Sequence, residues 1–186
     1  LFTAFAVGGV ANAINIIDGF NGLTAGVTLI MLGAFGLIAR QVGDIALAFT
    51  CLVIAASVAG FFVVNWPRGK IFLGDGGAYF LGFALAWIAV LLPERNASVS
   101  PWSSLLICIY PIAEVVMSFV RKSLRPGSHP SQPDAVHLHM LPNRRWAKKL
   151  WPNASLTTQN GLTAPLLWLY TLLPCSAAVF FYTSFW

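Results

Sequence analysis

Long apolar stretches alternate along the chain with short polar ones. A membrane-spanning helix needs about 20 apolar residues, or about 17 at the short end. Six stretches are candidates: Leu1–Ile17, Leu23–Ala39, Ile45–Val64, Ala78–Leu92, Trp102–Val120 and Leu162–Tyr182. Most are rich in Gly, Ala, Ser and Phe, which suits close helix packing within a bilayer. The pattern predicts an all-α, polytopic transmembrane helical bundle of about six spans.

Composition agrees with this fold class. Hydrophobic residues make up 58% of the chain and charged residues 9%, against about 25% charged in soluble domains. We expect residues 1–186 to form a single integral membrane domain, within which residues 121–161 are a cytoplasmic loop. Leu1 lies in an apolar run without an initiating Met or a basic segment, so we expect a fragment, truncated before Leu1, and not a signal peptide. The three cysteines lie in apolar runs without paired spacing and are interpreted as packing residues.

Basic residues are unevenly shared between the two sides of this bundle. When alternate loops are assigned to the same face, nine of the eleven Lys and Arg residues fall together and two, Arg40 and Arg95, fall opposite. An excess of Lys and Arg marks the cytoplasmic side. The nine are Arg68, Lys70, Arg121, Lys122, Arg125, Arg144, Arg145, Lys148 and Lys149. Three polar segments, all three histidines included, share this cytoplasmic face.

The first polar segment runs from Asn12 to Leu23. Asn12, Asn15 and Asp18 are spaced three apart, so they lie on one stripe of a helix. Polar residues within a span usually face protein or a water-filled cavity and indicate function. A polar packing stripe that ends in a glycine turn is the alternative.

The second polar segment contains Asp75 in a glycine-rich turn between two stretches without charge. Glycines at 74, 76 and 77 let the backbone approach a ligand closely. The pattern indicates a site for a metal ion and phosphate at a membrane surface, and a helix-capping Asp is the alternative. Arg68 and Lys70 suit a phosphorylated ligand or follow the positive-inside bias. Phe72 can stack on a ligand ring or anchor the loop at the interface.

The third polar segment contains Asp134, His137 and His139. Two histidines without a further nearby ligand make an incomplete transition-metal site, but imidazoles can bond phosphate oxygens. The following Arg and Lys residues, interleaved with Trp146 and Trp151, favour a segment held to anionic lipid over direct substrate contact. His129 has the context of an ordinary loop. Glu114, the one carboxylate inside a predicted span, is expected to pair with Arg121 or a polar helix neighbour, and no role is assigned to it.

Together the three segments suit a reaction between a water-soluble phosphorylated donor and a lipid acceptor. Phosphoryl transfer depends chiefly on positioning and on neutralising charge, to which Mg²⁺ contributes. Because Mg²⁺ takes one or two carboxylates and completes its shell with water or phosphate oxygens, Asp75 fits such a site.

Three blocks resemble the signatures of the polyprenyl-phosphate N-acetylhexosamine-1-phosphate transferases, a bacterial family that includes undecaprenyl-phosphate GlcNAc-1-phosphate transferases and the phospho-MurNAc-pentapeptide translocase. The blocks are Asn12-Ala-x-Asn15-x-x-Asp18-Gly-x-x-Gly22-Leu23, Asn65-x-Pro67 with Phe72-Leu-Gly-Asp75-x-Gly77, and Asp134-x-x-His137-x-His139. They occur in the family's order, and the resemblance covers nearly the whole chain. The long loop resembles the GlcNAc branch more than the translocase.

The resemblance implies a Mg²⁺-dependent phosphoglycosyltransferase, with Mn²⁺ as an alternative ion. Its reaction would transfer a sugar 1-phosphate, GlcNAc-1-phosphate or a related N-acetylhexosamine, from a UDP-sugar to undecaprenyl phosphate and release UMP. The implied setting is the cytoplasmic face of a bacterial inner membrane, in cell-wall, lipopolysaccharide or other envelope synthesis. Membrane lipid is an expected partner, a homodimer is an open arrangement, and no nucleic acid is expected.

Residue roles follow from the same resemblance. Asp18, Asp75, His137 and His139 would be catalytic, with the histidines contacting the phosphates or sugar of the donor. Asp75, with Asn15, would hold the metal. The residues implied in substrate binding are Asn12, Asn15, Asn65, Phe72 and Lys70, with Phe72 stacking on the uracil ring.

The chain departs from the family pattern at three places. Asn21 stands where a second Asp is common, and Met140 where a further His is common. The family's Asp-Asp block would precede residue 1, so we expect the fragment to need those missing spans for activity. A secondary transporter is a competing function, but its polar groups should lie near the midplane. A non-catalytic membrane scaffold is the third.

Overall fold

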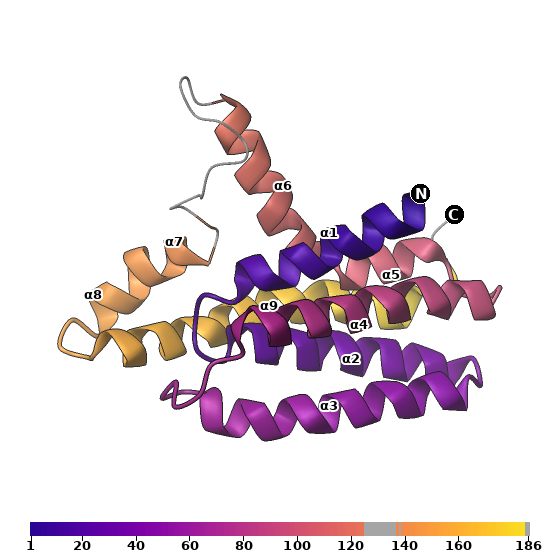
Figure 1. Cartoon of the computed structure of the whole chain (residues 1–186), viewed down its shortest axis with the longest axis horizontal. Coiled ribbons are helices and arrows are strands. Elements are labelled where there is room, and N and C mark those ends of the chain that lie inside the picture. Colours follow the sequence, from indigo (N-terminus) through magenta and orange to yellow (C-terminus); the bar gives the residue numbers. More distant parts are fainter. Residues whose placement is uncertain (125–136, 138, 185–186) are drawn as a thin grey trace.

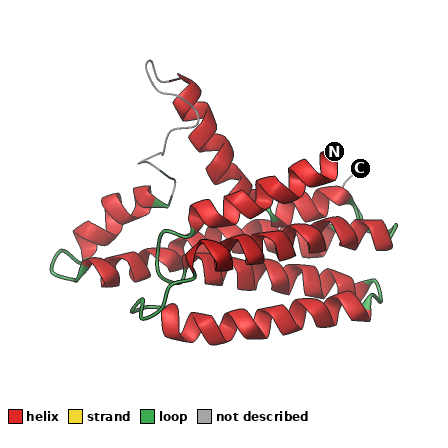
Figure 2. Cartoon of the chain, viewed as in Figure 1, coloured by secondary structure: helices red, strands yellow, loops and turns green. Residues whose placement is uncertain are grey.

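A computed structural model describes residues 1–124, 137 and 139–184, and every regular element in these residues is a helix (Figure 1 and Figure 2). The all-α prediction is therefore confirmed. The elements are α1 Phe2–Ile17, α2 Leu23–Gln41, α3 Ile45–Asn65, α4 Gly74–Arg95, α5 Pro101–Ile107, α6 Ile109–Leu124, α7 Met140–Pro142, the π-helix η1 Asn143–Ala147, α8 Lys148–Leu150 and α9 Leu156–Phe181.

Four helices in the described part of the chain, α2, α3, α4 and α9, are long and apolar enough to cross a membrane. The bent pair α5 and α6 would make a fifth span. Helix α1, which covers the predicted span Leu1–Ile17, has 16 residues and is too short to qualify. The polytopic bundle is confirmed, with four or five spans in place of the six expected.

The long helices run side by side along the long axis of the molecule, with α2 packed against α3, α4 and α9 (Figure 1). The side chains of Met31, Phe35 and Ile38 on α2 are fully buried. Helix α3 lies at the edge and leaves apolar side chains such as Phe49 and Val63 exposed. In water such a surface would be costly, whereas in a bilayer the lipid tails cover it. The exposed α3 therefore fits a lipid-facing helix.

Helices α1 and α4 approach each other closely at Gly82. A Cβ atom placed on Gly82 would lie 2.6 Å from the Cα of Ala11. Since real Cβ atoms do not approach backbone so closely, a larger residue at 82 would push the two helices apart. The absence of a side chain thus sets the spacing of α1 and α4.

The predicted span Trp102–Val120 is broken at Cys108, and this prediction of one continuous helix is wrong. Helices α5 and α6 meet at an angle of 71°, and α6 projects from the bundle (Figure 1). Pro111 lacks the N–H that would bond the carbonyl of Ile107 in a continuous helix. That carbonyl accepts instead from the Cys175 thiol on α9, at 3.7 Å. Pro111 therefore explains the break, and the Cys175 thiol replaces the missing N–H as a donor to the Ile107 carbonyl.

At the end of the bundle opposite the first two polar segments, one carboxylate connects two parts of the chain. Asp44 caps α3 by accepting from the backbone N–H of Leu47 at 3.1 Å. It also pairs with Arg95 at 3.0 Å and accepts from Asn96 at 3.3 Å. These contacts tie the α2–α3 turn to the end of α4.

Candidate active site

The first two polar segments meet where α1 ends and α4 begins. Asn15 on α1 donates from Nδ2 to Oδ1 of Asp75 on α4, at 3.1 Å. Asp75 is exposed and lies in the first turn of α4, which begins at Gly74, four residues before the predicted span. A carboxylate in a first turn is favoured by the helix dipole. The capping alternative is wrong, because the N-cap residue is Leu73 and no side chain caps this helix.

Asp18 follows the last residue of α1 and is half-buried. Burial raises the pKa of the Asp18 carboxyl, and the negative charge of Asp75 raises this pKa further. The two carboxylates therefore interact, and a bound cation would relieve their repulsion. Asn12, one helical turn before Asn15, is exposed.

Asn65 joins the two loops that carry these groups. Its Oδ1 accepts from the backbone N–H of Gly22 at 2.6 Å, and its Nδ2 donates to the carbonyl of Ile71 at 2.7 Å. The side chain is buried, so its amide orders the α1–α2 turn against the loop that leads to Asp75. The role of Asn65 in binding uridine stays a prediction.

Gly22 is required at the turn that Asn65 holds. Its φ angle is +76°, in the left-handed region, and a Cβ would lie 2.4 Å from the ring of Trp66. Trp168 on α9 donates from its indole to the Gly22 carbonyl at 3.1 Å, and Trp66 donates to the carbonyl of Gly161 at 2.8 Å. Sequence reasoning missed Trp168, which has no polar neighbour in the sequence to mark it.

Asn21 has a structural role that an Asp could not fill. Its buried Nδ2 donates to the carbonyls of Pro67, at 3.3 Å, and Thr157, at 3.2 Å. A carboxylate has no donor for two carbonyl oxygens. At this position, where the family commonly has Asp, Asn21 therefore ties the α1–α2 turn to the loop after α3 and to the first turn of α9.

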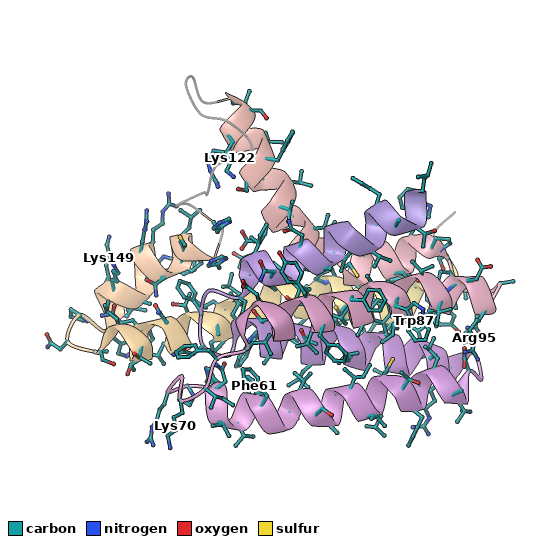
Figure 3. All side chains as sticks on the ribbon, viewed as in Figure 1. Phe61, Lys70, Trp87, Arg95, Lys122 and Lys149 are labelled. Atoms are coloured by element: carbon teal, nitrogen blue, oxygen red, sulfur yellow. The ribbon has the colours of Figure 1, made fainter. Side chains whose placement is uncertain are left out.

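Two predicted substrate-binding residues lie exposed on the loop between α3 and α4. The ring of Phe72 is 76% exposed, and Lys70 is also exposed. Figure 3 shows Lys70 at the same end of the molecule as Lys149, with Arg95 at the opposite end. Both Phe72 and Lys70 are thus accessible to a ligand, and their contacts with substrate stay predictions.

The described histidines lie beside the α1–α2 turn. The ring of His139 stacks on that of His137, with centroids 5.3 Å apart, and meets Phe20 edge-on at 5.2 Å. His139 is 1% exposed, whereas His137 is half-buried. The third polar segment therefore joins the first. Asp134, Arg125 and His129 lie outside the described residues.

Glu114 on α6 contacts His139, the buried member of this histidine pair. Its Oε1 accepts from the backbone N–H of His139 at 2.9 Å and lies 3.1 Å from His139 Nδ1. It also accepts from the hydroxyl of Tyr110 at 3.2 Å, which confirms the expected pairing with a polar helix neighbour. The lone carboxylate in an apolar span was the signal for a function here, but its partner could not be identified from sequence.

The carboxylates fit a sparse magnesium site. Within residues 1–124, 137 and 139–184, no three His, Cys, Asp or Glu side chains converge where they could hold a metal ion. Mg²⁺ does not need such a group, because one or two carboxylates with water and phosphate oxygens suffice. The exposed Asp75, its neighbour Asn15 and the interacting Asp18 match that chemistry.

Comparison with known proteins gives a consistent set of matches. The model of a family described as glycosyl transferase family 4 matches residues 1–93, half of the chain. An undecaprenyl-phosphate alpha-N-acetylglucosaminyl 1-phosphate transferase of Yersinia pestis is 33% identical over 144 residues, 75% of this chain and 39% of the relative. The protein of the same name in Escherichia coli (strain K12) matches to the same extent.

A third bacterial relative gives a similar match. A probable undecaprenyl-phosphate N-acetylglucosaminyl 1-phosphate transferase of Bacillus subtilis (strain 168) is 33% identical over 138 residues, 74% of this chain and 38% of the relative. The chain spans about two fifths of the length of the curated relatives it matches.

Proposed function

The chain belongs to glycosyl transferase family 4, and on this basis we propose that it is part of an enzyme that transfers a sugar 1-phosphate to undecaprenyl phosphate. The donor is a UDP-sugar, UDP-GlcNAc or a related UDP-N-acetylhexosamine, and UMP is released. The observation that carries the proposal is the bond between Asn15 and Asp75, 60 residues apart in sequence, at an exposed end of a membrane bundle. The names of the relatives support the same chemistry.

The reaction exchanges one phosphoanhydride bond for another. An oxygen of the acceptor phosphate bonds to the phosphorus attached to the sugar, and the bridging oxygen leaves with UMP. A phosphate monoester is largely dianionic at neutral pH, because its second pKa is about 6. The attacking oxygen therefore needs no base from the protein, and the main tasks of the site are to position the reactants and to offset negative charge.

The chain's own residues can perform these tasks. Asp75, held by Asn15, and Asp18 would hold Mg²⁺, which when bound supplies positive charge to the phosphates. The exposed Lys70 adds a positive charge, and the exposed ring of Phe72 offers a stacking surface for uracil. We place this site on the cytoplasmic face of a bacterial inner membrane, since the excess of Lys and Arg falls at this end.

The proposal is tested with the product of the complete gene, so that any residues before Leu1 are present. UMP release is measured from UDP-GlcNAc and undecaprenyl phosphate with Mg²⁺, for the unchanged protein, Asp75→Asn and Asp44→Asn. We expect release to be lost in Asp75→Asn and with a chelator, and to persist in Asp44→Asn, whose carboxylate lies at the other end. If the folded protein releases UMP from neither UDP-GlcNAc nor a panel of other UDP-sugars, the proposal is overturned.

A further inference from the structure

Glu114 and His139 form a buried pair that the proposed reaction does not itself require. Both side chains are 1% exposed. One carboxylate oxygen, Oε1 of Glu114, is within hydrogen-bonding distance of three donors: the Tyr110 hydroxyl, the His139 backbone N–H and His139 Nδ1. Burying a carboxylate is costly unless its bonds are satisfied. A group kept at such cost in an apolar helix indicates a specific task.

The carboxylate determines which nitrogen of His139 carries hydrogen. An ionised carboxylate only accepts, so Nδ1 must be the donor in this contact. The other ring nitrogen then faces the turn after α1, since a Cβ placed on Gly19 would lie 3.0 Å from Nε2. Gly19 directly follows Asp18. The buried pair thus connects α6 to the turn that carries the half-buried carboxylate of the candidate active site.

The ring of His139 also supports His137. The two histidine rings are nearly parallel, with an interplanar angle of 7°. Phe20 packs against the His139 ring in a T-shaped contact. His137 is the more exposed of the two, so it is the histidine that a ligand can reach.

We propose that Glu114 is a positioning residue: through His139 it holds the His137 imidazole beside the Asp18–Gly19 turn. His139 is the buried support, and His137 makes the contact with the donor phosphates. This inference rests on the proposed transferase function, and it separates two histidines that the sequence motif treats alike. In metal sites, a carboxylate that bonds a ligating histidine fixes the orientation of the ring, and its loss costs about 10- to 100-fold in affinity or activity. We expect a loss of similar size here.

The first test does not depend on activity. The product of the complete gene is expressed with ¹⁵N-histidine, purified in detergent and studied by NMR. The signals of the His139 ring are assigned by their loss in His139→Asn. We expect Nδ1 to be protonated in the unchanged protein and to lose its proton in Glu114→Leu, where the free imidazole prefers Nε2–H. A bare Nδ1 in the unchanged protein, or the same signal in Glu114→Leu, would overturn the proposal. If Glu114→Leu does not fold, Glu114→Met, which is close to Glu in volume and also lacks an oxygen acceptor, takes its place with the same expected loss of the Nδ1 proton.

The second test asks whether Glu114 acts through His137. We expect Glu114→Leu to lower kcat for UMP release about 10- to 100-fold, while the matched Glu94→Leu at the opposite, exposed end of α4 leaves kcat unchanged. Adding Glu114→Leu to His137→Asn should cost little more than His137→Asn alone, because residues in one network are not additive. Full additivity, or normal kcat in a folded Glu114→Leu, would overturn the proposal.

The two tests separate failure of this inference from failure of the proposed function. An unchanged protein that releases no UMP, yet shows a Glu114-dependent Nδ1 proton, retains the buried pair but refutes the transferase role and with it the catalytic positioning. If the unchanged protein releases UMP but its His139 Nδ1 signal is the same in Glu114→Leu, only the positioning role of Glu114 is refuted.

Discussion

At the scale of single residues, Asp18 is where folding and the proposed chemistry oppose each other. Its carboxyl is half-buried, and burial together with the Asp75 carboxylate raises its pKa. The folded protein therefore keeps a proton that the unfolded chain has already released, over the range between the ordinary Asp pKa of about 3.9 and the raised value. The free energy of unfolding falls as pH rises through this range. Ionised Asp18 thus costs stability.

Asp18→Asn is accordingly expected to raise the melting temperature at neutral pH in a chelator, since the amide cannot ionise. The difference from the unchanged protein should shrink as pH falls from the raised pKa towards about 3.9, and should vanish below that pH. Unfolding can be followed by differential scanning calorimetry, which reports melting temperatures at both neutral and acidic pH.

Asp44→Asn is the matched control for this prediction. It weakens the ion pair with Arg95 at the other end, so its melting temperature should fall or stay level. A melting temperature for Asp18→Asn that is no higher than that of the unchanged protein at neutral pH would show that the buried carboxylate is not a net cost.

At the scale of elements, the packing of α1 on α4 determines whether the candidate active site exists. The sequence places Asn15 and Asp75 in separate segments, and the two meet where α1 packs on α4, which approach closely at Ala11 and Gly82. The distance between α1 and α4 at Ala11 and Gly82 therefore affects the distance between Asn15 and Asp75, which lie one to two helical turns away.

Gly82→Ala is expected to destabilise the fold by about 1–3 kcal/mol, the usual cost of overpacking, and to lower UMP release. The new Cβ would meet the backbone of Ala11 at 2.6 Å, so α1 and α4 must separate. Thermal unfolding and the UMP assay measure both effects.

Gly60→Ala on α3 is the control, because nothing lies within 4 Å of a Cβ at that position. It should be neutral, or stabilise the helix by up to about 1 kcal/mol. If both substitutions lower the melting temperature equally, the close approach of α1 and α4 is not the cause.

The elements also show where sequence reasoning succeeds and where it stops. Apolar length predicts α2 and α3 to within about two residues, because a helix that crosses a bilayer needs about 20 apolar residues whether it faces lipid or other helices. It fails at α5 and α6, because hydropathy does not register that Pro111 removes a backbone donor. It also starts α4 too late, since glycines that resemble a loop are tolerated in a helix that begins at Gly74.

At the scale of the whole molecule, the shared location of the three polar segments follows from alternation of loops. The bonds between Asn15 and Asp75 and between Asn65 and Gly22, with the contact of His139 on Phe20, confirm that all three segments share one end. The partners inside that end could not be predicted, because contacts such as Glu114 with His139 depend on helix rotation and on the bend before α6.

The orientation of the bundle is a prediction at this scale. Ser98 and Asn153 are exposed on loops at the two ends. In intact cells a membrane-impermeant maleimide should label Ser98→Cys directly, but Asn153→Cys only after the membrane is permeabilised, since Lys and Arg favour the cytoplasmic side.

The unchanged protein gives the background for this labelling, because Cys51, Cys108 and Cys175 are buried. The reverse labelling pattern would place the candidate active site outside the cytoplasm, where nucleotide sugars are not supplied by the cell, and would argue against the proposed donor.

The exposed ring of Phe72 lies three residues before the exposed carboxylate of Asp75, where a membrane helix begins. An enzyme at such a boundary receives one reactant from solution and the other from the membrane. The nucleotide sugar arrives by three-dimensional diffusion in the aqueous phase, and the polyprenyl carrier by two-dimensional diffusion within the bilayer. The rate should then follow the mole fraction of carrier among the surrounding lipids, so that adding inert lipid slows turnover even when both reactants and enzyme are held at constant total concentration.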